Sequence, residues 1–169
     1  MSEYVTQYLT MRRDLQPILP KGFAYASNEA YVLARGTVFE SAALTEDEQR
    51  IVSAAMLHTV DRSFQKKQCY YNSQLLAIAD ATGTLKYVEG YAAGGIIPLP
   101  HGWCTINNKV VDVTWRHETK PIFGKFPAEW GYIGVVFDDT DALFAKIART
   151  GVVQSQLDDF ENGFPHLRA

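Results

Sequence analysis

The stretch "HGWCTINNKVVDVTW" (residues 101–115) predicts a β-hairpin. Asn107 and Asn108 both tolerate the positive φ angles that a two-residue turn requires. With this turn, His101, Trp103 and Asp112 share one face of the hairpin, because side chains alternate along each strand. The imidazole and the carboxylate then become diagonal neighbours roughly 7 Å apart, a separation that their side chains can bridge. The hairpin therefore predicts a hydrogen-bonded His–Asp pair.

A second stretch, "KKQCYYNSQLLAIA" (residues 66–79), predicts a helix with a cysteine in its first turn. Its apolar spacing is helical from about Cys69 to Ala81, and Gly83 can end such a helix in a left-handed conformation. The helix dipole and a charged His101 would both favour the thiolate of Cys69. The carboxylate of Asp112 would fix the ring tautomer. These three side chains can therefore act as nucleophile, base and orienting group.

Cys104 is the other cysteine of the chain, and it lies one residue from Trp103 on the same predicted strand. Because side chains alternate, Cys104 points away from His101 and Asp112. We therefore interpret Cys104 as structural.

The order "QCYYN", "YVEGY", "HGW" and "VVDVTW" resembles the core of the transglutaminase-like superfamily of papain-type cysteine enzymes. In that family a Cys commonly follows Gln and precedes an aromatic residue, and a His-x-Trp strand and an Asp-bearing strand come later. The resemblance covers about residues 68–115. It implies that Cys69 is the nucleophile, His101 the general base and acid, and Asp112 its orienting partner. Val113 departs from the family pattern, which usually has Pro after the Asp.

The resemblance also implies an α+β fold of papain or transglutaminase-like type. In it, the nucleophile helix packs on an antiparallel sheet of residues 87–92, 101–106, 109–115 and 131–137. The amide of Cys69 would be the first oxyanion donor, and the further oxyanion or cleft candidates are Gln68, Gln65 and Trp103. The implied chemistry is acyl transfer: hydrolysis of an amide or peptide bond, deamidation, or transfer to an amine. A protein, a peptide or a small amide or acyl compound would be the substrate, and neither a metal nor an organic cofactor is required.

Other segments give weaker patterns. Residues 3–13 predict a short helix, with Tyr4, Tyr8 and Met11 on one side, and residues 30–39 have strand-like content with a bend at Gly36. Thr45 lies three residues before Glu48, the capping-box spacing, so a helix should follow. Residues 139–150 predict another helix, ended by Gly151. Residues 154–169 are polar and receive no assignment.

Isolated acidic residues carry no motif. Asp80, Glu89 and the acidic cluster of residues 138–141 fall outside the patterns that suggest chemistry. A solvated surface or a helix cap is the expected role for such residues.

Length and composition limit the class of protein. The chain has 169 residues, of which 47% are apolar and 21% charged, with a formal net charge of −3. We expect one domain over residues 1–169, with an N-terminal helical and extended region (1–60), the core motifs (68–115) and a C-terminal strand, helix and tail (131–169). The negative charge argues against nucleic acid as a partner. The histidines and cysteines show no close zinc-ligand spacing.

Location and partners remain at the level of expectation. No apolar run approaches the roughly 20 residues of a membrane span, and the first 19 residues lack the order of a signal peptide. We therefore expect a cytoplasmic protein with reduced cysteines and no membrane partner. Two alternatives stay open: a non-catalytic binding or inhibitor protein on a degenerate scaffold of the same type, and a domain in which His101 and Asp112 only stabilise the hairpin. The oligomeric state is unknown from the sequence.

Overall fold

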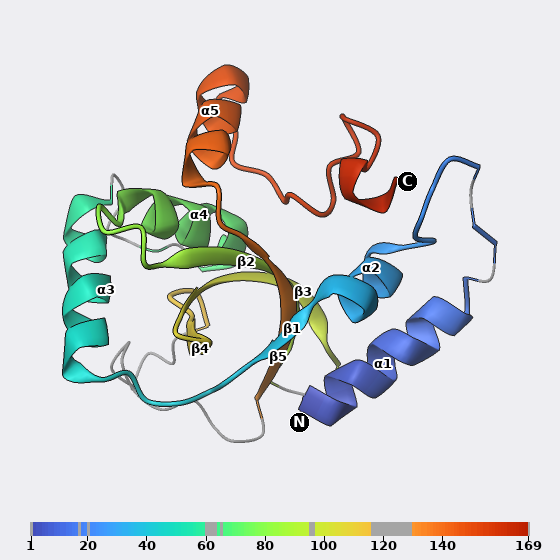
Figure 1. Cartoon of the computed structure of the whole chain (residues 1–169), viewed down its shortest axis with the longest axis horizontal. Helices are drawn as coiled ribbons and strands as arrows, with labels where there is room; N and C mark the ends of the chain where they lie inside the picture. The colour runs from blue at the N-terminus through green and yellow to red at the C-terminus, as the bar shows by residue number, and fades with distance from the viewer. Residues whose placement is uncertain are drawn as a thin grey trace.

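The computed structural model describes residues 2–16, 18–19, 21–59, 64, 66–94, 97–115 and 130–168. Within this part the chain is α+β, with a five-stranded antiparallel sheet in the order β1-β5-β2-β3-β4 (Figure 1). The strands are β1 (Thr37–Phe39), β2 (Lys86–Ala93), β3 (Leu99–Ile106), β4 (Lys109–Val111) and β5 (Gly131–Phe137). The helices are α1 (Ser2–Asp14), α2 (Asn28–Arg35), α3 (Glu46–His58), α4 (Cys69–Ala79) and α5 (Thr140–Thr150), and a 3₁₀ turn spans Pro165–Leu167.

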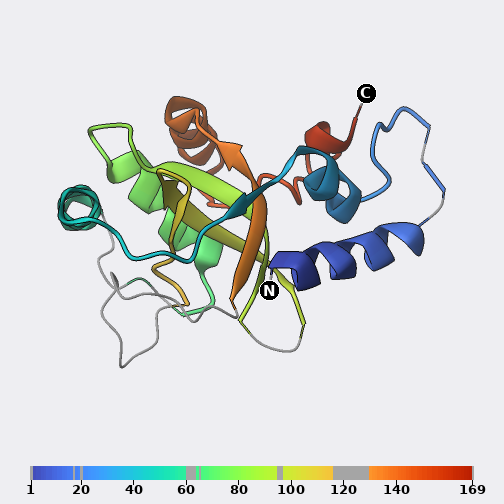
Figure 2. The ribbon, with the colours of Figure 1, turned by 60° about the horizontal axis from the view of Figure 1, so that its bottom comes forward.

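The sheet curls, and its two faces bury different cores (Figures 1 and 2). Gly90 and Gly134 stand opposite each other on β2 and β5, and a Cβ at Gly90 would lie 2.1 Å from the carbonyl oxygen of Ile133. Glycine at this point lets the two backbones approach closely. The inner face of the curl is filled by the cluster Phe39, Val88, Ala92, Trp103, Val110 and Tyr132.

The helices cover the outer face in two groups. One cluster joins α3, α4 and α5 to β2 and β3 through side chains such as Val52, Leu76, Leu143, Tyr87 and Cys104. The other joins α1 and α2 to β2 and β5 through Val5, Leu9, Val32, Tyr91 and Ile133. Alternate side chains of the strands point outward, and the helices bury them. This arrangement is expected when a layer of helices packs on one face of a sheet.

The predicted hairpin is confirmed at its turn and wrong at its end. Asn107 and Asn108 have φ angles of 49° and 63°, and the pairs run up to Cys104 opposite Val111. The predicted strand to Trp115 stops at Val111. The carboxylate of Asp112 accepts hydrogen bonds from the backbone N–H groups of Thr114 and Trp115, at 2.9 Å each, and this turn takes the chain out of the sheet.

The predicted helices are confirmed with small changes at their ends. In α3 the capping box of Thr45 and Glu48 is formed, and α5 ends at Gly151, which has a φ of 70°. In α4 the helix ends at Ala79, two residues early, and Gly83 takes its positive φ of 64° in the turn that follows. The prediction for α1 is confirmed in extent, but Val5 and Leu9 form its buried side.

The strand predicted for residues 30–39 is wrong over its first part. A helix, α2, occupies Asn28–Arg35, and only Thr37–Phe39 form a strand, β1. Ser27 caps this helix by accepting a hydrogen bond from the amide of Ala30, and Val32 is fully buried under α1. A cap and tertiary burial outweigh the β-propensity of the local residues.

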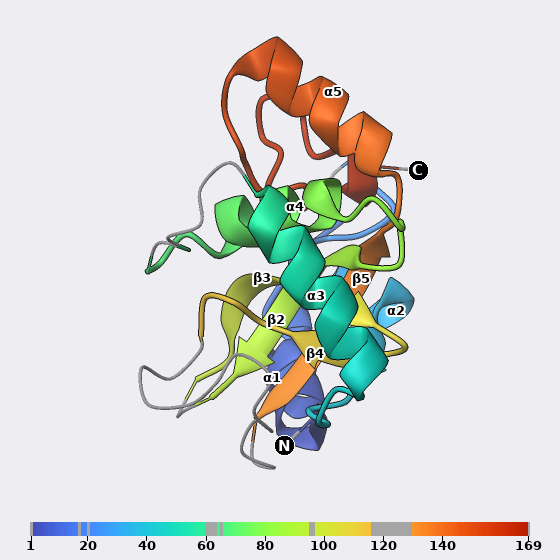
Figure 3. The same cartoon turned by 90° about the vertical axis from the view of Figure 1, so that its left-hand side faces the viewer.

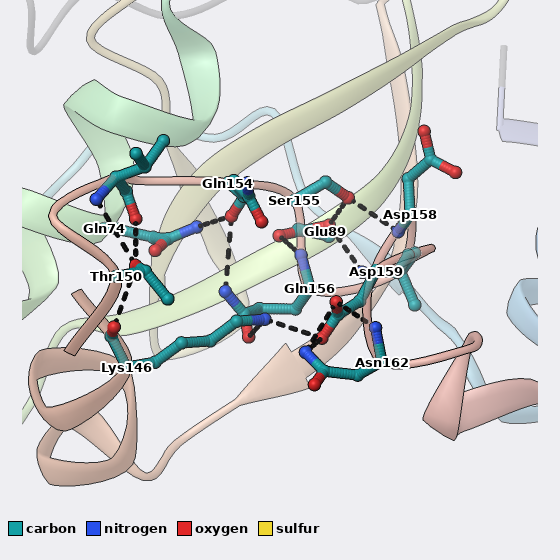
Figure 4. Close-up of polar contacts among 12 residues, drawn as sticks. Gln74, Glu89, Lys146, Thr150, Gln154, Ser155, Gln156, Asp158, Asp159 and Asn162 are labelled. Atoms are coloured by element: carbon teal, nitrogen blue, oxygen red, sulfur yellow. Dashed lines mark hydrogen bonds and ion pairs between the residues drawn. The ribbon is translucent and has the colours of Figure 1, made fainter.

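The C-terminal segment is tied to the sheet by a buried carboxylate. Glu89, expected on a solvated surface or at a cap, is only 1% exposed on β2 and accepts four hydrogen bonds. Figure 4 shows this carboxylate beside Ser155 and Gln156. Three of the donors belong to Ser155, Gln156 and Leu157. Lys146 of α5 adds an ion pair to Asp159 at 2.8 Å. The residues that the sequence left unassigned are therefore fixed against β2.

The expected capping roles are found at two acidic residues. Asp139 caps α5 by accepting a hydrogen bond from the amide of Ala142 at 2.8 Å. Asp80 follows α4 and accepts hydrogen bonds from the amides of Thr82 and Leu85. Within the described residues, no helix combines the length and the apolar content required to cross a bilayer.

Candidate active site

Cys69 is the first residue of α4, as the sequence predicted. Lys67, two residues earlier, has a φ of 65°, and Gln68 forms the N-cap. The first helical backbone bond is donated by the amide of Asn72 to the carbonyl of Gln68 at 2.9 Å, so the amides before Asn72 precede the hydrogen-bonded ladder. The Cys69 side chain is partly exposed. It therefore sits at a helix N-terminus, the end at which backbone N–H groups favour negative charge.

Two polar contacts hold the start of α4 beside the part of β3 that β4 does not cover. Ser73 donates its hydroxyl to the carbonyl of Gly102 at 3.0 Å, and Asn72 donates its side-chain amide to the Thr114 hydroxyl at 2.9 Å. A Cβ at Gly102 would lie 2.9 Å from the ring of Tyr70, so glycine permits this approach. Figure 3 shows α4 between α5 and the sheet. These contacts bring Cys69 to the edge at which His101 lies.

The predicted hydrogen bond between His101 and Asp112 is present. Nε2 of His101 lies 2.7 Å from Oδ2 of Asp112, and the two side chains are 2% and 0% exposed. The Cys69 side chain lies close enough to the imidazole to raise the pKa of His101. Because Nε2 is occupied by the carboxylate, Nδ1 is the ring nitrogen left for the thiol. The three residues that the sequence singled out thus form one connected group.

The charges of His101 and Asp112 stabilise each other. Burial would lower the pKa of His101, but the charge of Asp112, its hydrogen bond and the contact with Cys69 outweigh burial and raise that pKa to about 9. Burial would likewise raise the pKa of Asp112, but the charge and hydrogen bond of His101 outweigh it and hold that pKa below its usual value. At neutral pH the pair is therefore an imidazolium beside a carboxylate.

Asp112 has a further partner that sequence reasoning missed. The hydroxyl of Tyr132, on β5, donates to Oδ2 at 3.1 Å, while Oδ1 accepts the amides of Thr114 and Trp115. Burial, followed by the charge of Asp112, raises the pKa of Tyr132 well above its usual value, so the phenol remains a donor. An aromatic residue in a strand looks like core, and only the pairing of β5 with β2 places this hydroxyl in the site.

Two tryptophans flank the imidazole ring. Trp115 stacks on His101 with ring centroids 4.2 Å apart, and Trp103 lies 6.2 Å away at 18°. Trp103 is fully buried in the inner cluster, so it supports the ring from the core and is not part of a cleft wall. Trp115 is partly exposed and is the closer aromatic neighbour. Together they limit rotation of the imidazole.

The remaining candidates have different outcomes. Gln68 is exposed at the N-cap and makes no capping hydrogen bond, so its amide is available as a donor. Gln65 lies outside the described residues. Cys104 points to the outer face, as predicted, and its thiol donates to the carbonyl of Ser73 at 3.1 Å. Burial raises the pKa of this thiol, which fits a structural residue.

Neither a group of metal ligands among the described residues nor similarity to a known protein indicates what this site does. In the part of the chain that the structure describes, no group of three or more His, Cys, Asp or Glu side chains could hold a metal ion. Comparison with protein-family models, with curated proteins and with solved structures finds no match to this chain. The function is therefore argued from the geometry of the site.

Proposed function

We propose that this protein is a cysteine-dependent acyl-transfer enzyme that uses Cys69, His101 and Asp112. One observation carries the proposal: a partly exposed cysteine at a helix N-terminus lies beside an imidazole whose Nε2 is held at 2.7 Å by a buried carboxylate. This is the arrangement of nucleophile, base and orienting group that acyl transfer requires.

In the first half of the reaction, the Cys69 thiolate attacks the carbonyl carbon of an amide or thioester. Backbone N–H groups at the start of α4 stabilise the oxyanion, and Gln68 supplies a second donor from the N-cap. The imidazolium of His101 gives the proton on Nδ1 to the leaving group as the bond to the carbonyl breaks. The products of this step are a thioester on Cys69 and a free amine or thiol.

In the second half, His101 acts as a base. Neutral Nδ1 takes a proton from water or from an acceptor amine, which attacks the thioester and releases Cys69. Asp112 holds the ring through Nε2 in both halves, so the same nitrogen faces the substrate throughout. Hydrolysis, deamidation and transfer to an amine differ only in the leaving group and the acceptor.

The order and placement of the elements support a papain or transglutaminase-like fold for this enzyme. The nucleophile begins a helix packed on an antiparallel sheet, the histidine lies on β3, and the aspartate follows the next strand. We also expect the enzyme to act in the cytoplasm, where thiols stay reduced, because both cysteines are free.

Acyl-enzyme formation tests the proposal directly. Incubation with a p-nitrophenyl ester should acylate Cys69, seen by peptide mass spectrometry, in the wild type and in the control variant Cys104→Ala. Cys69→Ala should show neither the adduct nor turnover while keeping its circular dichroism spectrum. An active Cys69→Ala protein with unaltered kinetics would refute the assignment. A thiol that is never acylated and alkylates slowly would favour the binding-protein alternative.

A further inference from the structure

Asn72 joins the start of α4 to the turn that carries Asp112. It lies three residues after Cys69, so the two side chains share one side of the helix. The side-chain amide of Asn72 donates to the Thr114 hydroxyl at 2.9 Å, and Asn72 is only 2% exposed. This hydrogen bond therefore connects two elements that are distant in the sequence, and each of them holds one member of the proposed triad.

The turn after β4 is held against the imidazole by several contacts. Oδ1 of Asp112 accepts the amides of Thr114 and Trp115 at 2.9 Å each. Oδ2 of the same carboxylate lies 2.7 Å from Nε2 of His101, and the Trp115 ring stacks on the imidazole with centroids 4.2 Å apart. The position of Thr114 is thus set relative to the ring. A side chain bound to Thr114 is placed relative to the same ring.

The next residue of α4 makes the second contact of the helix in this region. The Ser73 hydroxyl donates to the carbonyl of Gly102 at 3.0 Å, and Gly102 follows His101 on β3. With this contact alone, the start of α4 could still pivot about Ser73. The bond from Asn72 lies in a different direction, toward the turn after β4, and it stops that movement.

We propose that Asn72 is a positioning residue for the reaction: through Thr114 it sets the separation between the Cys69 thiol and the imidazole. This inference rests on the proposed function, since it takes Cys69 as the nucleophile. The attraction between a thiolate and an imidazolium weakens as their separation grows. A displacement of about 1 Å at a reacting group can lower a rate about a hundredfold. Asn72 therefore acts on the reaction through the position of Cys69.

Gln74 offers a matched control on the same helix. It is fully buried, and its side-chain amide donates to the Tyr87 hydroxyl at 3.1 Å and to the carbonyl of Gln154 at 2.7 Å (Figure 4). These contacts tie α4 to β2 and to the C-terminal segment, and not to the turn after β4. Asn72→Ala and Gln74→Ala each remove one buried amide from α4, so both should lower the free energy of unfolding in urea titrations.

Iodoacetamide alkylation of Cys69 against pH separates positioning from stability, with peptide mass spectrometry to distinguish it from Cys104. In the wild type we expect fast labelling at pH 6.5. Asn72→Ala should lower this rate about tenfold and move the acid limb of the profile to higher pH, since residues in one hydrogen-bond network couple by about that factor. Thr114→Val, which removes the hydroxyl, should do the same, whereas Thr114→Ser should keep the wild-type profile. Gln74→Ala should leave the profile unchanged.

The double variant Asn72→Ala/Thr114→Val tests whether the two residues act through one bond. Its labelling rate should equal that of either single variant, and a rate lowered by the product of the two single effects would overturn the inference.

Two further results separate this inference from the function on which it rests. Fast wild-type labelling that Asn72→Ala leaves unchanged, or an equal change in Gln74→Ala, would overturn the positioning role and leave the enzyme assignment intact. Slow labelling of Cys69 in the wild type would count against the proposed function itself, and the positioning role would fail with it.

Discussion

Replacing Asp112 by Asn should disable the site while preserving its shape. In the wild type, Oδ1 accepts two backbone amides and Oδ2 accepts the Tyr132 hydroxyl and His101. An Asn must keep its oxygen toward the two amides, so its NH₂ replaces Oδ2 and donates to Nε2 of the ring. The ring proton then moves to Nδ1, and His101 becomes a neutral imidazole that cannot accept a proton from Cys69.

The size of this effect follows from the raised pKa of His101. The rise of the His101 pKa from 6.5 to about 9 corresponds to about 3 kcal/mol in favour of the charged ring. Without the carboxylate, we expect burial, the largest single influence on the ring, to outweigh the remaining effect of Cys69 and take the pKa of His101 below 6.5. At pH 7.5 the charged fraction of His101 then falls from about 97% to below about 10%. The charged His101 stabilises the folded protein fully at pH values below the pKa of the imidazole in the unfolded chain. This contribution to folding stability is lost as the pH rises through about 9.

The assay is iodoacetamide alkylation of Cys69 against pH, with Cys104 as an internal control. We expect the Cys69 rate at pH 7.5 to fall at least about tenfold in Asp112→Asn. Turnover should fall about a thousandfold or more, because the wrong tautomer blocks both halves of the reaction. Cys104 is buried and should label slowly in both proteins. An Asp112→Asn protein that labels and turns over at wild-type rates would refute the charge argument.

Two further predictions concern contacts around this site. Tyr132→Phe removes one hydrogen bond to Asp112, so we expect the free energy of unfolding in urea titrations to fall by about 2 kcal/mol. We also expect the acid limb of the Cys69 labelling profile to move to higher pH. No change in either measurement would contradict a role of Tyr132 in positioning Asp112. Glu48, paired with Lys109 at 2.8 Å, has a pKa lowered to about 2; burial opposes this shift, but hydrogen bonds, chiefly from Lys109, outweigh it. This pair should therefore add about 1 kcal/mol above pH 4.5 after solvent screening and lose it toward pH 2. A stability difference from Glu48→Gln that does not change with pH would rule out the pair as its source.

Local signals predicted the parts of the site that depend on short stretches of chain. The two asparagines need only a tight turn, and the turn sets the register that brings His101 and Asp112 to one face. The position of Cys69 in the first turn of a helix follows from the spacing of the residues after it. Alternation along β3 also placed Cys104 on the opposite face.

Local signals failed where propensity competed with tertiary contacts. Residues 30–35 have side chains that suit a strand, yet a cap at Ser27 and burial of Val32 against α1 make them part of a helix. The strand after the turn was expected to reach Trp115, but the carboxylate of Asp112 binds the backbone ahead of it and ends β4 early. In that case the catalytic candidate itself changed the local structure.

The sequence by itself determined the turn of the hairpin, the helix that begins at Cys69 and the identities of Cys69, His101 and Asp112 as a candidate group, because each depends on periodicity or turn chemistry within a few residues. Only the tertiary structure decided which groups complete the site. Tyr132 reaches Asp112 through the pairing of β5 with β2, and Glu89 becomes buried because the C-terminal segment folds over it. Contacts between residues distant along the chain leave no local pattern, since they arise from the packing of whole elements.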